Sequence, residues 1–211
     1  LKIEFYYYRG SEKFPLEIKN KEEKFCFHLR SKPLFFRLDP DYECPAKKVK
    51  LEVSRSLLHE QLKRDKDPIG RIEAAQSLVA KVSQADIKVL SQGLKKETQW
   101  GVANRIAKAL GKIGGESARD GLLKAVKSRE AKIRRGIVQA LGEFIGDEKV
   151  TRILKKIAGS DPSYRVEAEA LSSLGRIKAK NCRPFLEGFL DRASHNDIGR
   201  SAIFRALASL E

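Results

Sequence analysis

Residues 164–177 read YRVEAEALSSLGRI, and this stretch carries the pattern that decides the fold. Ala170 and Leu171 lie four and three residues before Leu174, and Ile177 lies three residues after it. Residues at these offsets share one face of an α-helix. The arrangement recurs around five leucines at intervals of 32, 31, 33 and 33 residues: Leu78, Leu110, Leu141, Leu174 and Leu207. We therefore predict one helix with this apolar stripe in every repeat.

Small residues flank the key leucine of each repeat. The residue before it is Ser or Ala every time. The residue after it is, in chain order, Val79, Gly111, Gly142, Gly175 and Ala208. Small side chains, and glycine above all, allow a neighbouring backbone to come close. We therefore expect the striped helices to lie against one another from repeat to repeat.

A second row of leucines interleaves with the first at intervals of 32, 33, 31 and 32 residues: Leu58, Leu90, Leu123, Leu154 and Leu186. This row belongs to shorter predicted helices, among them residues 86–95, 117–127, 149–158 and 182–192. Gly, Pro and capping residues fall where the helices should turn: Asp67-Pro68, Gly114-Gly115, Gly146-Asp147, Asp161-Pro162 and residues 194–197. Two rows with one period indicate a repeated unit of two helices.

Five such units run from about Val53 to the end of the sequence, and about three must stack before their apolar stripes are buried. Residues 69–75 and 164–171 resemble HEAT repeats of the short kind. The predicted fold class is mainly α: a HEAT-like α-solenoid of about five helix pairs over residues 54–211, preceded by a small antiparallel β module over residues 1–53.

The first 53 residues alternate apolar and polar side chains with a period of two, which is typical of β-strands. Five short strands are predicted, near residues 1–7, 14–18, 25–29, 34–38 and 49–53. A segment of this size makes only a marginal core by itself. The module is therefore expected to pack on the first helix pair or on protein outside this chain.

The chain is strongly basic, with 43 Lys and Arg against 28 Asp and Glu and a formal charge of +15. Residues 1–53 contribute +3 and the remainder contributes +12. A basic solenoid is able to bind nucleic acid, because neutralising phosphates supplies affinity. The more ordinary interpretation is that solvated Lys and Arg side chains on outer faces favour solubility.

Cysteine usage and hydropathy bear on the cellular compartment. Cys26, Cys44 and Cys182 show no Cys-x-x-Cys spacing, which favours free thiols in a reducing compartment, and the predicted location is cytoplasmic. Apolar runs stay short of the roughly 18 residues of a membrane span, and no signal-peptide pattern opens the chain. No membrane partner is expected. The chain begins at Leu1 and contains no Met, so Leu1 need not be a natural N-terminus.

One segment begins like a zinc-peptidase motif. His59-Glu60-Gln61-Leu62-Lys63 starts as His-Glu-x-x-His does, but Lys63 stands where the second histidine would bind the metal. A lysine cation repels zinc, and His28 and His195 suggest no set of ligands. Phosphate-binding loops and Gly-x-Ser-x-Gly are absent, and the glycines of residues 111–115 mark a turn. This chain is therefore predicted to carry no catalytic residue, metal ligand or cofactor.

The join between the two regions is similar to a known family. Residues 14–18 and 32–40 are followed, after a basic stretch, by residues 58–62 and 67–75. This succession resembles the C-terminal part of zinc aminopeptidases of the aminopeptidase N family, closest to their prokaryotic members. It is also similar to the related non-catalytic subunit of transcription factor TFIID. The resemblance covers nearly the whole chain and is sharpest over residues 14–80.

The resemblance implies a non-catalytic segment of a larger metallopeptidase. The family's His-Glu-x-x-His helix and Gly-x-Met-x-Asn strand are not in this chain, so it implies zinc only in an upstream catalytic domain of the same polypeptide. By analogy, the solenoid would serve as a scaffold and a gate over the substrate site, with a peptide substrate or another protein as partner. The β module would be the end of a β-sandwich and would act as a spacer.

Candidate cations for binding a partner lie on the striped helices. Six are singled out: Arg71, Arg134 and Arg200, seven residues before a key leucine, and Arg105, Lys108 and Lys112, at i, i+3 and i+7 of one helix. One hypothesis is that some of them line a concave surface and meet an acidic or carboxylate partner. The alternative is that the arginine row, which Ala103 and Glu167 interrupt, forms repeat-to-repeat hydrogen bonds to neighbouring Asp or Glu.

Three functions are compatible with these residues. The first is the scaffold and gate of an aminopeptidase. The second is a protein-interaction HEAT-repeat scaffold from a parent that lacks the zinc site. The third is a basic HEAT-like module that binds nucleic acid, which salt-dependent binding of arbitrary duplex DNA would support.

Overall fold

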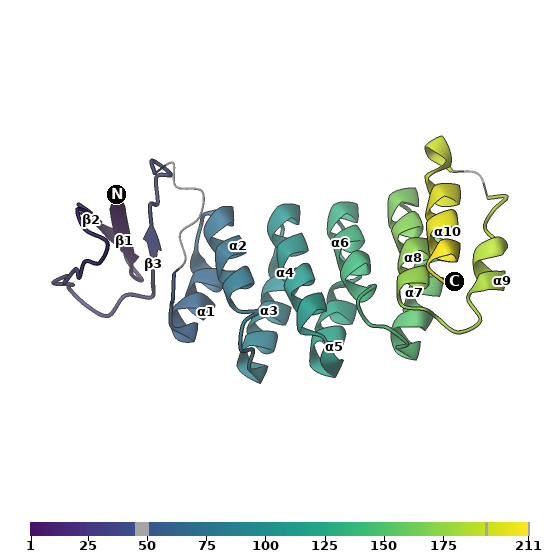
Figure 1. Ribbon diagram of the computed structural model, residues 1–211, viewed down its shortest axis with the longest axis horizontal. Helices are drawn as coiled ribbons and strands as arrows, with labels where there is room; N and C mark the ends of the chain where they lie inside the picture. The colour runs from purple at the N-terminus through teal and green to yellow at the C-terminus, as the bar shows by residue number, and fades with distance from the viewer. Residues whose placement is uncertain (45–50, 193, 211) are drawn as a thin grey trace. The chain divides into compact units, whose positions relative to one another are not determined.

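The computed structural model describes residues 1–44, 51–192 and 194–210. The chain forms two compact units, Leu1–Ser77 and Leu78–Glu211. Among the described residues, strands occur in the first unit, and helices occur in both (Figure 1).

The first unit begins with a three-stranded antiparallel sheet. β1 (Lys2–Tyr6) lies in the middle, between β2 (Ser11–Pro15) and β3 (Phe35–Leu38). The turn from β1 to β2 contains Gly10 at a φ of +77°, a left-handed conformation that glycine adopts without steric cost. This tight turn sets the register in which Ile3 pairs with Phe14.

Alternation along the strands gives the sheet two different faces. On one face, the Phe5 ring centroid lies 5.9 Å from that of Phe14 and 5.1 Å from that of Phe27. On the other face, the rings of Tyr6 and Phe35 stack with their centroids 4.5 Å apart. Aromatic pairs of this kind stabilise a sheet beyond the area that they bury.

Two of the five predicted strands are wrong in the part of the chain that the structure describes. Residues 25–29 form no strand, because Phe27 packs its ring on Phe5 and Phe14 from outside the ladder. Residues 51–53 form no strand either, and Val49 of the same predicted strand lies outside the described residues. The strand predicted over residues 14–18 lies earlier, at β2, because the turn at Gly10 fixes its start.

The first helix pair completes this unit. α1 (Arg55–Arg64) packs on β3 and on α2 (Pro68–Ser77), which confirms that the β module packs on the first pair. α2 starts at a proline, whose fixed φ suits the first position of a helix. The division between residues 1–53 and 54–211 follows the change from strands to helices and stays a prediction. The compact unit itself includes both helices.

The second unit consists of helices in two rows (Figure 1). Its elements are α3 (Gln84–Lys96), α4 (Trp100–Ile113), α5 (Gly115–Ala125), α6 (Ala131–Leu141), α7 (Glu148–Ser160), α8 (Tyr164–Arg176), α9 (Arg183–Glu187), a short 3-10 turn (His195–Asp197) and α10 (Ile198–Ala208). In one row, α4 packs on α6, α6 on α8, and α8 on α10; in the other, α3 packs on α5. Together with α1 and α2 they make the five predicted helix pairs, so the repeated-pair α fold is confirmed.

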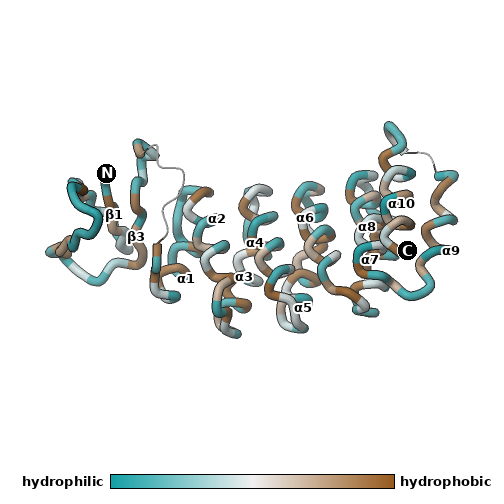
Figure 2. Tube along the Cα trace, in the orientation of Figure 1, coloured by the Kyte–Doolittle hydropathy of each residue, from teal (hydrophilic) through white to brown (hydrophobic). Residues whose placement is uncertain are grey.

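The key leucines form the core of the second unit. Leu110, Leu141 and Leu174 are fully buried, whereas Leu207 on the last helix is partly exposed. In the other row, Leu122 takes the buried place predicted for Leu123, because one residue turns a helix by about 100° and α5 presents its neighbour to the core. Hydrophobic and hydrophilic residues accordingly alternate around these helices (Figure 2).

Glycines set the spacing within the row of α4, α6, α8 and α10. A Cβ atom on Gly111 would lie 3.0 Å from the carbonyl oxygen of Ala140, and one on Gly175 would lie 2.5 Å from the Cα atom of Ala206. Ordinary van der Waals contact begins at 3.4 Å. The close approach expected from these two glycines is therefore confirmed.

Polar residues start the helices where the sequence places the turns. Ser83 and Asp86 form a capping box at the start of α3, each bonding the other's backbone N–H. Asp147 caps α7 by accepting a hydrogen bond from the Val150 N–H at 2.9 Å. These caps fix where each helix begins and so fix which side chains reach the surface.

Candidate interaction surface

A basic surface follows the row of α4, α6, α8 and α10. Eight cations occupy equivalent offsets from the key leucines on this row: Arg105, Lys108, Lys112, Lys132, Arg135, Arg165, Arg176 and Arg205. The offsets are nine, six, five and two residues before the leucine and two after it, which make one stripe along each helix. The same offsets hold two acidic residues, Glu143 and Glu169. We call these eight cations the basic face.

The basic face contains a hollow lined by residues of α6, α8 and α10. These three helices follow one another along the row (Figure 1). The hollow has a volume of about 450 Å³ and includes four arginines: Arg135, Arg165, Arg176 and Arg205. We call these four the arginine hollow. Gln139, Ser172 and Glu169 also line it, so polar groups surround the cations.

Arg176 is the anchored member of the arginine hollow. Its Nη2 donates to Glu169 Oε1 at 2.9 Å and to Ser173 Oγ at 2.6 Å, and it approaches the Gln139 carbonyl oxygen at 3.4 Å. Glu169 is therefore already engaged by one of the four guanidinium groups. With one carboxylate against four guanidinium groups, the hollow keeps a net positive charge.

The remaining three arginines of the hollow are exposed and hold no carboxylate within the described residues. Arg134, directly before Arg135, behaves in the opposite way: its Nε and Nη2 bind the two Asp161 oxygens at 2.8 Å each. The Asp161 hydrogen bonds raise the pKa of the Arg134 guanidinium. Neighbouring arginines thus divide between a structural ion pair and an open cation.

The six cations singled out in the sequence fall into two groups. Arg71 Nη1 donates to the carbonyl oxygens of Asp65 and Lys66, six and five residues earlier, at 2.9 and 3.2 Å. Arg134 Nη1 donates to the carbonyls of the equivalent residues, Ser128 and Arg129, at 3.0 and 2.9 Å. The arginine row therefore braces the turn between the helices of its own pair. A role in partner binding stays a prediction for these residues.

At Glu167, which interrupts the arginine row, an arginine–carboxylate pair also forms, but here the carboxylate lies on the striped helix and the arginine lies in the next repeat. Glu167 Oε1 accepts from Arg192 Nη2 at 3.0 Å, in the turn after α9. Arg200 follows a different pattern, with Nε near the Leu190 carbonyl at 3.3 Å and Nη1 3.4 Å from Asp197 Oδ1. Arginine-to-acid contacts between repeats, the alternative expectation, thus occur at Arg134 and at Glu167.

Arg105, Lys108 and Lys112 are exposed on α4, as their spacing predicts for one helix face. They are the α4 part of the basic face. Trp100, 49% exposed at the start of the same helix, lies under the ammonium group of Lys132, which is 5.1 Å from its ring centroid. An aromatic platform therefore borders the cations.

Sequence reasoning missed the arginine hollow. Its members lie nine, six and two residues before a key leucine and two after it. The arginine row, by contrast, consists of residues seven positions before the key leucines. Comparing every polar offset across the four helices identifies the arginines of the hollow. The hollow itself depends on how α6, α8 and α10 pack, which no single helix reveals.

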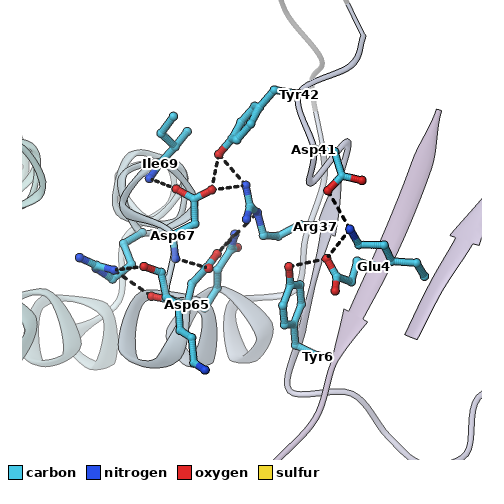
Figure 3. Close-up of polar contacts among 12 residues, drawn as sticks. Glu4, Tyr6, Arg37, Asp41, Tyr42, Asp65, Asp67 and Ile69 are labelled. Carbon is cyan, nitrogen blue, oxygen red and sulfur yellow. Dashed lines mark hydrogen bonds and ion pairs between the residues drawn. The ribbon is translucent and has the colours of Figure 1, made fainter. Parts of the chain in front are cut away.

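A second polar cluster, in the first unit, is internally satisfied (Figure 3). Arg37 Nη2 lies 2.7 Å from Asp67 Oδ2, and its Nε lies 3.8 Å from Asp65 Oδ2. The Arg37 side chain is 8% exposed, and Tyr42 bridges it to Asp67 through its hydroxyl. With each charge paired, this cluster joins β3 to the turn between α1 and α2 and leaves no open group for a ligand.

Burial and pairing shift the carboxyl groups of this cluster in opposite directions. Desolvation raises the pKa of Asp65 despite the hydrogen bond from the Asp67 N–H and the Arg37 charge. Desolvation also acts on Asp67, but hydrogen bonds from Tyr42 and the Ile69 N–H, with Arg37, bring its pKa below the usual value. Of these two carboxyl groups, Asp67 is therefore the one that keeps its charge to lower pH.

Metal-binding and membrane-spanning features bear on function alongside the polar clusters. In the part of the chain that the structure describes, no group of three or more His, Cys, Asp and Glu side chains is placed to hold a metal ion. In the segment that begins like a zinc motif, Lys63 Nζ lies 3.1 Å from Glu60 Oε1, so an ion pair occupies that side of α1. No helix among the described residues combines the length and apolarity that a membrane span requires.

Comparison with known proteins bears on the family. A family model described as HEAT repeats matches residues 55–131 and 120–208. The structure of the complex of CpcE and CpcF of phycocyanin lyase from Nostoc sp. PCC7120 is similar to this chain, with a TM-score of 0.60 and 22% sequence identity. The similarity covers 80% of this chain and 68% of that chain, and at this identity it shows the fold alone. No curated protein matches the sequence significantly.

These comparisons overturn the resemblance to the aminopeptidase N family. The helical pattern that carried it falls within residues matched by the HEAT-repeat model, so the leucine periodicity belongs to the repeat itself. A β-sandwich needs two facing sheets, and residues 1–44 form one small sheet. The zinc-peptidase parent, its upstream catalytic domain and the gate over a substrate site therefore have no support.

Proposed function

This chain belongs to the HEAT-repeat family, and from that premise we propose that it is a non-catalytic scaffold that binds an acidic protein through its basic face. The observation that carries the proposal is the imbalance of charge on one continuous surface. Eight cations stand there against Glu143 and Glu169. Seven of the eight hold no acidic partner within the described residues, Arg176 being the exception.

Exposed cations that hold no carboxylate suit electrostatic recognition. They keep most of their hydration until a partner arrives, and their summed field speeds the encounter with an acidic surface. Trp100 beside Lys132 adds a rigid apolar contact of the kind that contributes most to protein interfaces. The proposed partner is therefore a protein segment rich in Asp and Glu.

The family supports a binding role because stacked repeats present long surfaces on which several neighbouring helices act together. The similar structure is a complex of CpcE with CpcF, so a fold of this kind assembles with another protein there. Of the two polar clusters described, one is paired internally and the other is dominated by arginines, which suits binding of an anionic partner.

The test measures binding of a short fluorescein-labelled Glu-rich peptide to the full chain by fluorescence anisotropy. The variant Arg105→Ala/Lys108→Ala/Lys112→Ala removes the α4 part of the basic face. At about 0.5 kcal/mol for each exposed charge, it should weaken binding by about 1.5 kcal/mol, or about tenfold.

The matched control is Lys88→Ala/Lys124→Ala/Lys156→Ala, which removes the same charge from exposed positions on α3, α5 and α7. It should keep the affinity of the parent chain. Equal loss in both variants would mean that net charge alone drives binding, which contradicts a defined face. Tighter binding of arbitrary duplex DNA than of the peptide near physiological salt would favour the nucleic-acid alternative instead.

A further inference from the structure

The arginine hollow carries more positive charge than its own side chains neutralise. Four guanidinium groups and one carboxylate line it, and Glu169 is bound to Arg176. Arg135, Arg165 and Arg205 come from three successive helices of one row, α6, α8 and α10. The positive charges in the hollow repel one another, and a bound anion would offset this repulsion.

Several arginines elsewhere in the chain have an acidic partner. Arg119 Nη1 binds Asp147 Oδ2 at 2.9 Å, and Arg192 Nη2 binds Glu167 Oε1 at 3.0 Å. Arg134 binds Asp161 through two hydrogen bonds, although Arg135 beside it binds no carboxylate among the described residues. The hollow therefore gathers in one place three arginines that hold no carboxylate among the described residues, whereas Arg119, Arg134 and Arg192 each have one.

We infer that the arginine hollow binds a phosphate monoester carried by the acidic partner segment. This inference rests on the proposed function and specifies the group that its surface selects. A phosphorylated side chain carries a charge of about −1.5 to −2 at neutral pH and offers three strong acceptor oxygens. A carboxylate offers one charge and two oxygens, so it neutralises less of this hollow.

Guanidinium geometry favours the same group. The planar fork of arginine donates two parallel hydrogen bonds to a phosphate, which a lysine ammonium does not do. Arg135, Arg165 and Arg205 hold no carboxylate within the described residues and are able to offer such a fork, whereas Arg176, held in place through Nη2, adds single N–H donors. Arg176 is thus ordered before binding and loses little freedom when it binds.

The size of the hollow places the phosphate on a larger molecule. Its volume of about 450 Å³ exceeds the space of a single anion and leaves room for the residue that bears the phosphate and for its neighbours. Ser172 and Gln139 supply neutral donors beside the cations. A phosphoserine or phosphothreonine within an acidic segment fills these requirements.

The experiment compares three labelled peptides that share one Glu-rich sequence and differ at the central residue, which is Ser, Glu or phosphoserine. Affinities for the full chain are measured by fluorescence anisotropy. We expect the phosphoserine peptide to bind at least about tenfold tighter than the Ser peptide, with the Glu peptide between them. Inorganic phosphate should displace the phosphopeptide at lower concentration than acetate does.

The variant Arg135→Gln/Arg205→Gln removes two open cations of the hollow. It should reduce the preference for phosphoserine over Ser to less than about threefold. Arg129→Gln/Arg152→Gln removes the same charge from exposed arginines that do not line the hollow, and it should keep the full preference. The preference is a ratio within one protein sample, so partial unfolding of a variant does not imitate the expected result.

The outcomes separate the inference from the proposed function. Equal binding of all three peptides overturns the phosphate site and leaves the acidic-partner scaffold standing. A preference that survives in Arg135→Gln/Arg205→Gln places the phosphate elsewhere and also overturns the site. Failure of every peptide to bind, the phosphopeptide included, overturns both.

Discussion

Gly175→Ala tests whether the row of α4, α6, α8 and α10 depends on close helix contact. The added Cβ would lie 2.5 Å from the Cα atom, 2.6 Å from the carbonyl oxygen and 2.8 Å from the Cβ atom of Ala206. All three are shorter than the 3.4 Å at which ordinary contact begins. Two of these atoms belong to the α10 backbone, so no side chain is able to rotate out of the way.

The expected cost follows from that geometry. Relieving the overlap requires α10 to move away from α8 by nearly 1 Å, and overpacking of a core costs about 1–3 kcal/mol. Replacing Gly by Ala in a helix gains at most about 1 kcal/mol in helix propensity. The net effect should be a destabilisation of about 1–2 kcal/mol.

Gly159→Ala is the matched control. Gly159 is the last residue but one of α7, as Gly175 is of α8, and nothing lies within 4 Å of its added Cβ. This substitution should therefore be neutral or stabilising by up to about 1 kcal/mol.

Urea denaturation followed by circular dichroism at 222 nm, a standard wavelength for helix, measures both variants. We expect Gly175→Ala to unfold at a lower urea midpoint than the parent chain and Gly159→Ala at an equal or higher one. Equal midpoints for the two variants would refute the reasoning, because the substitutions differ only in what the new methyl group meets.

Two further predictions concern charged groups. Arg134→Gln should lower the free energy of unfolding by about 2 kcal/mol, because it breaks the two hydrogen bonds to Asp161. Arg135→Gln should change the free energy of unfolding by less than about 0.5 kcal/mol, because Arg135 binds no carboxylate among the described residues. Equal effects of the two variants in urea denaturation would contradict this difference between the two arginines. Asp67, whose folded-state pKa is lowered, stabilises the fold above the unfolded pKa of about 4, and this contribution is lost as the pH falls through its folded-state value. Asp67→Asn should therefore show a smaller fall in melting temperature than the parent chain between about pH 4 and pH 2, and an unchanged pH profile would show that Arg37 does not hold this carboxylate.

Much of the helical architecture follows from local pattern alone. Leu110, Leu141 and Leu174 repeat at one period because each must fill the same place between helices, and the spacing of such residues is visible in a sequence. A small residue follows the key leucine in the same way, and Gly175 at this position predicts the close contact with the neighbouring helix. Leu122 and Leu123 show where this reasoning stops, because a shift of one residue leaves the period intact and only the start of α5 decides which leucine is buried.

The β module and the arginine hollow depend on contacts that are distant in sequence. Residues 25–29 alternate as a strand does, yet Phe27 packs against Phe5 and Phe14 from outside the ladder, and the alternation does not distinguish the two. Arg134 and Arg135 are neighbours with the same chemistry. Their separation into an ion pair and an open cation depends on Asp161, which lies 27 residues away.

The most direct test of the scaffold proposal is to map where a Glu-rich peptide protects the chain from amide hydrogen exchange. The account predicts that protection gathers on the exposed side of α4, α6, α8 and α10 and is greatest around the hollow that Arg135, Arg165 and Arg205 line. Protection confined to α3, α5 and α7, or binding without any protection of the row that bears the basic face, would contradict it.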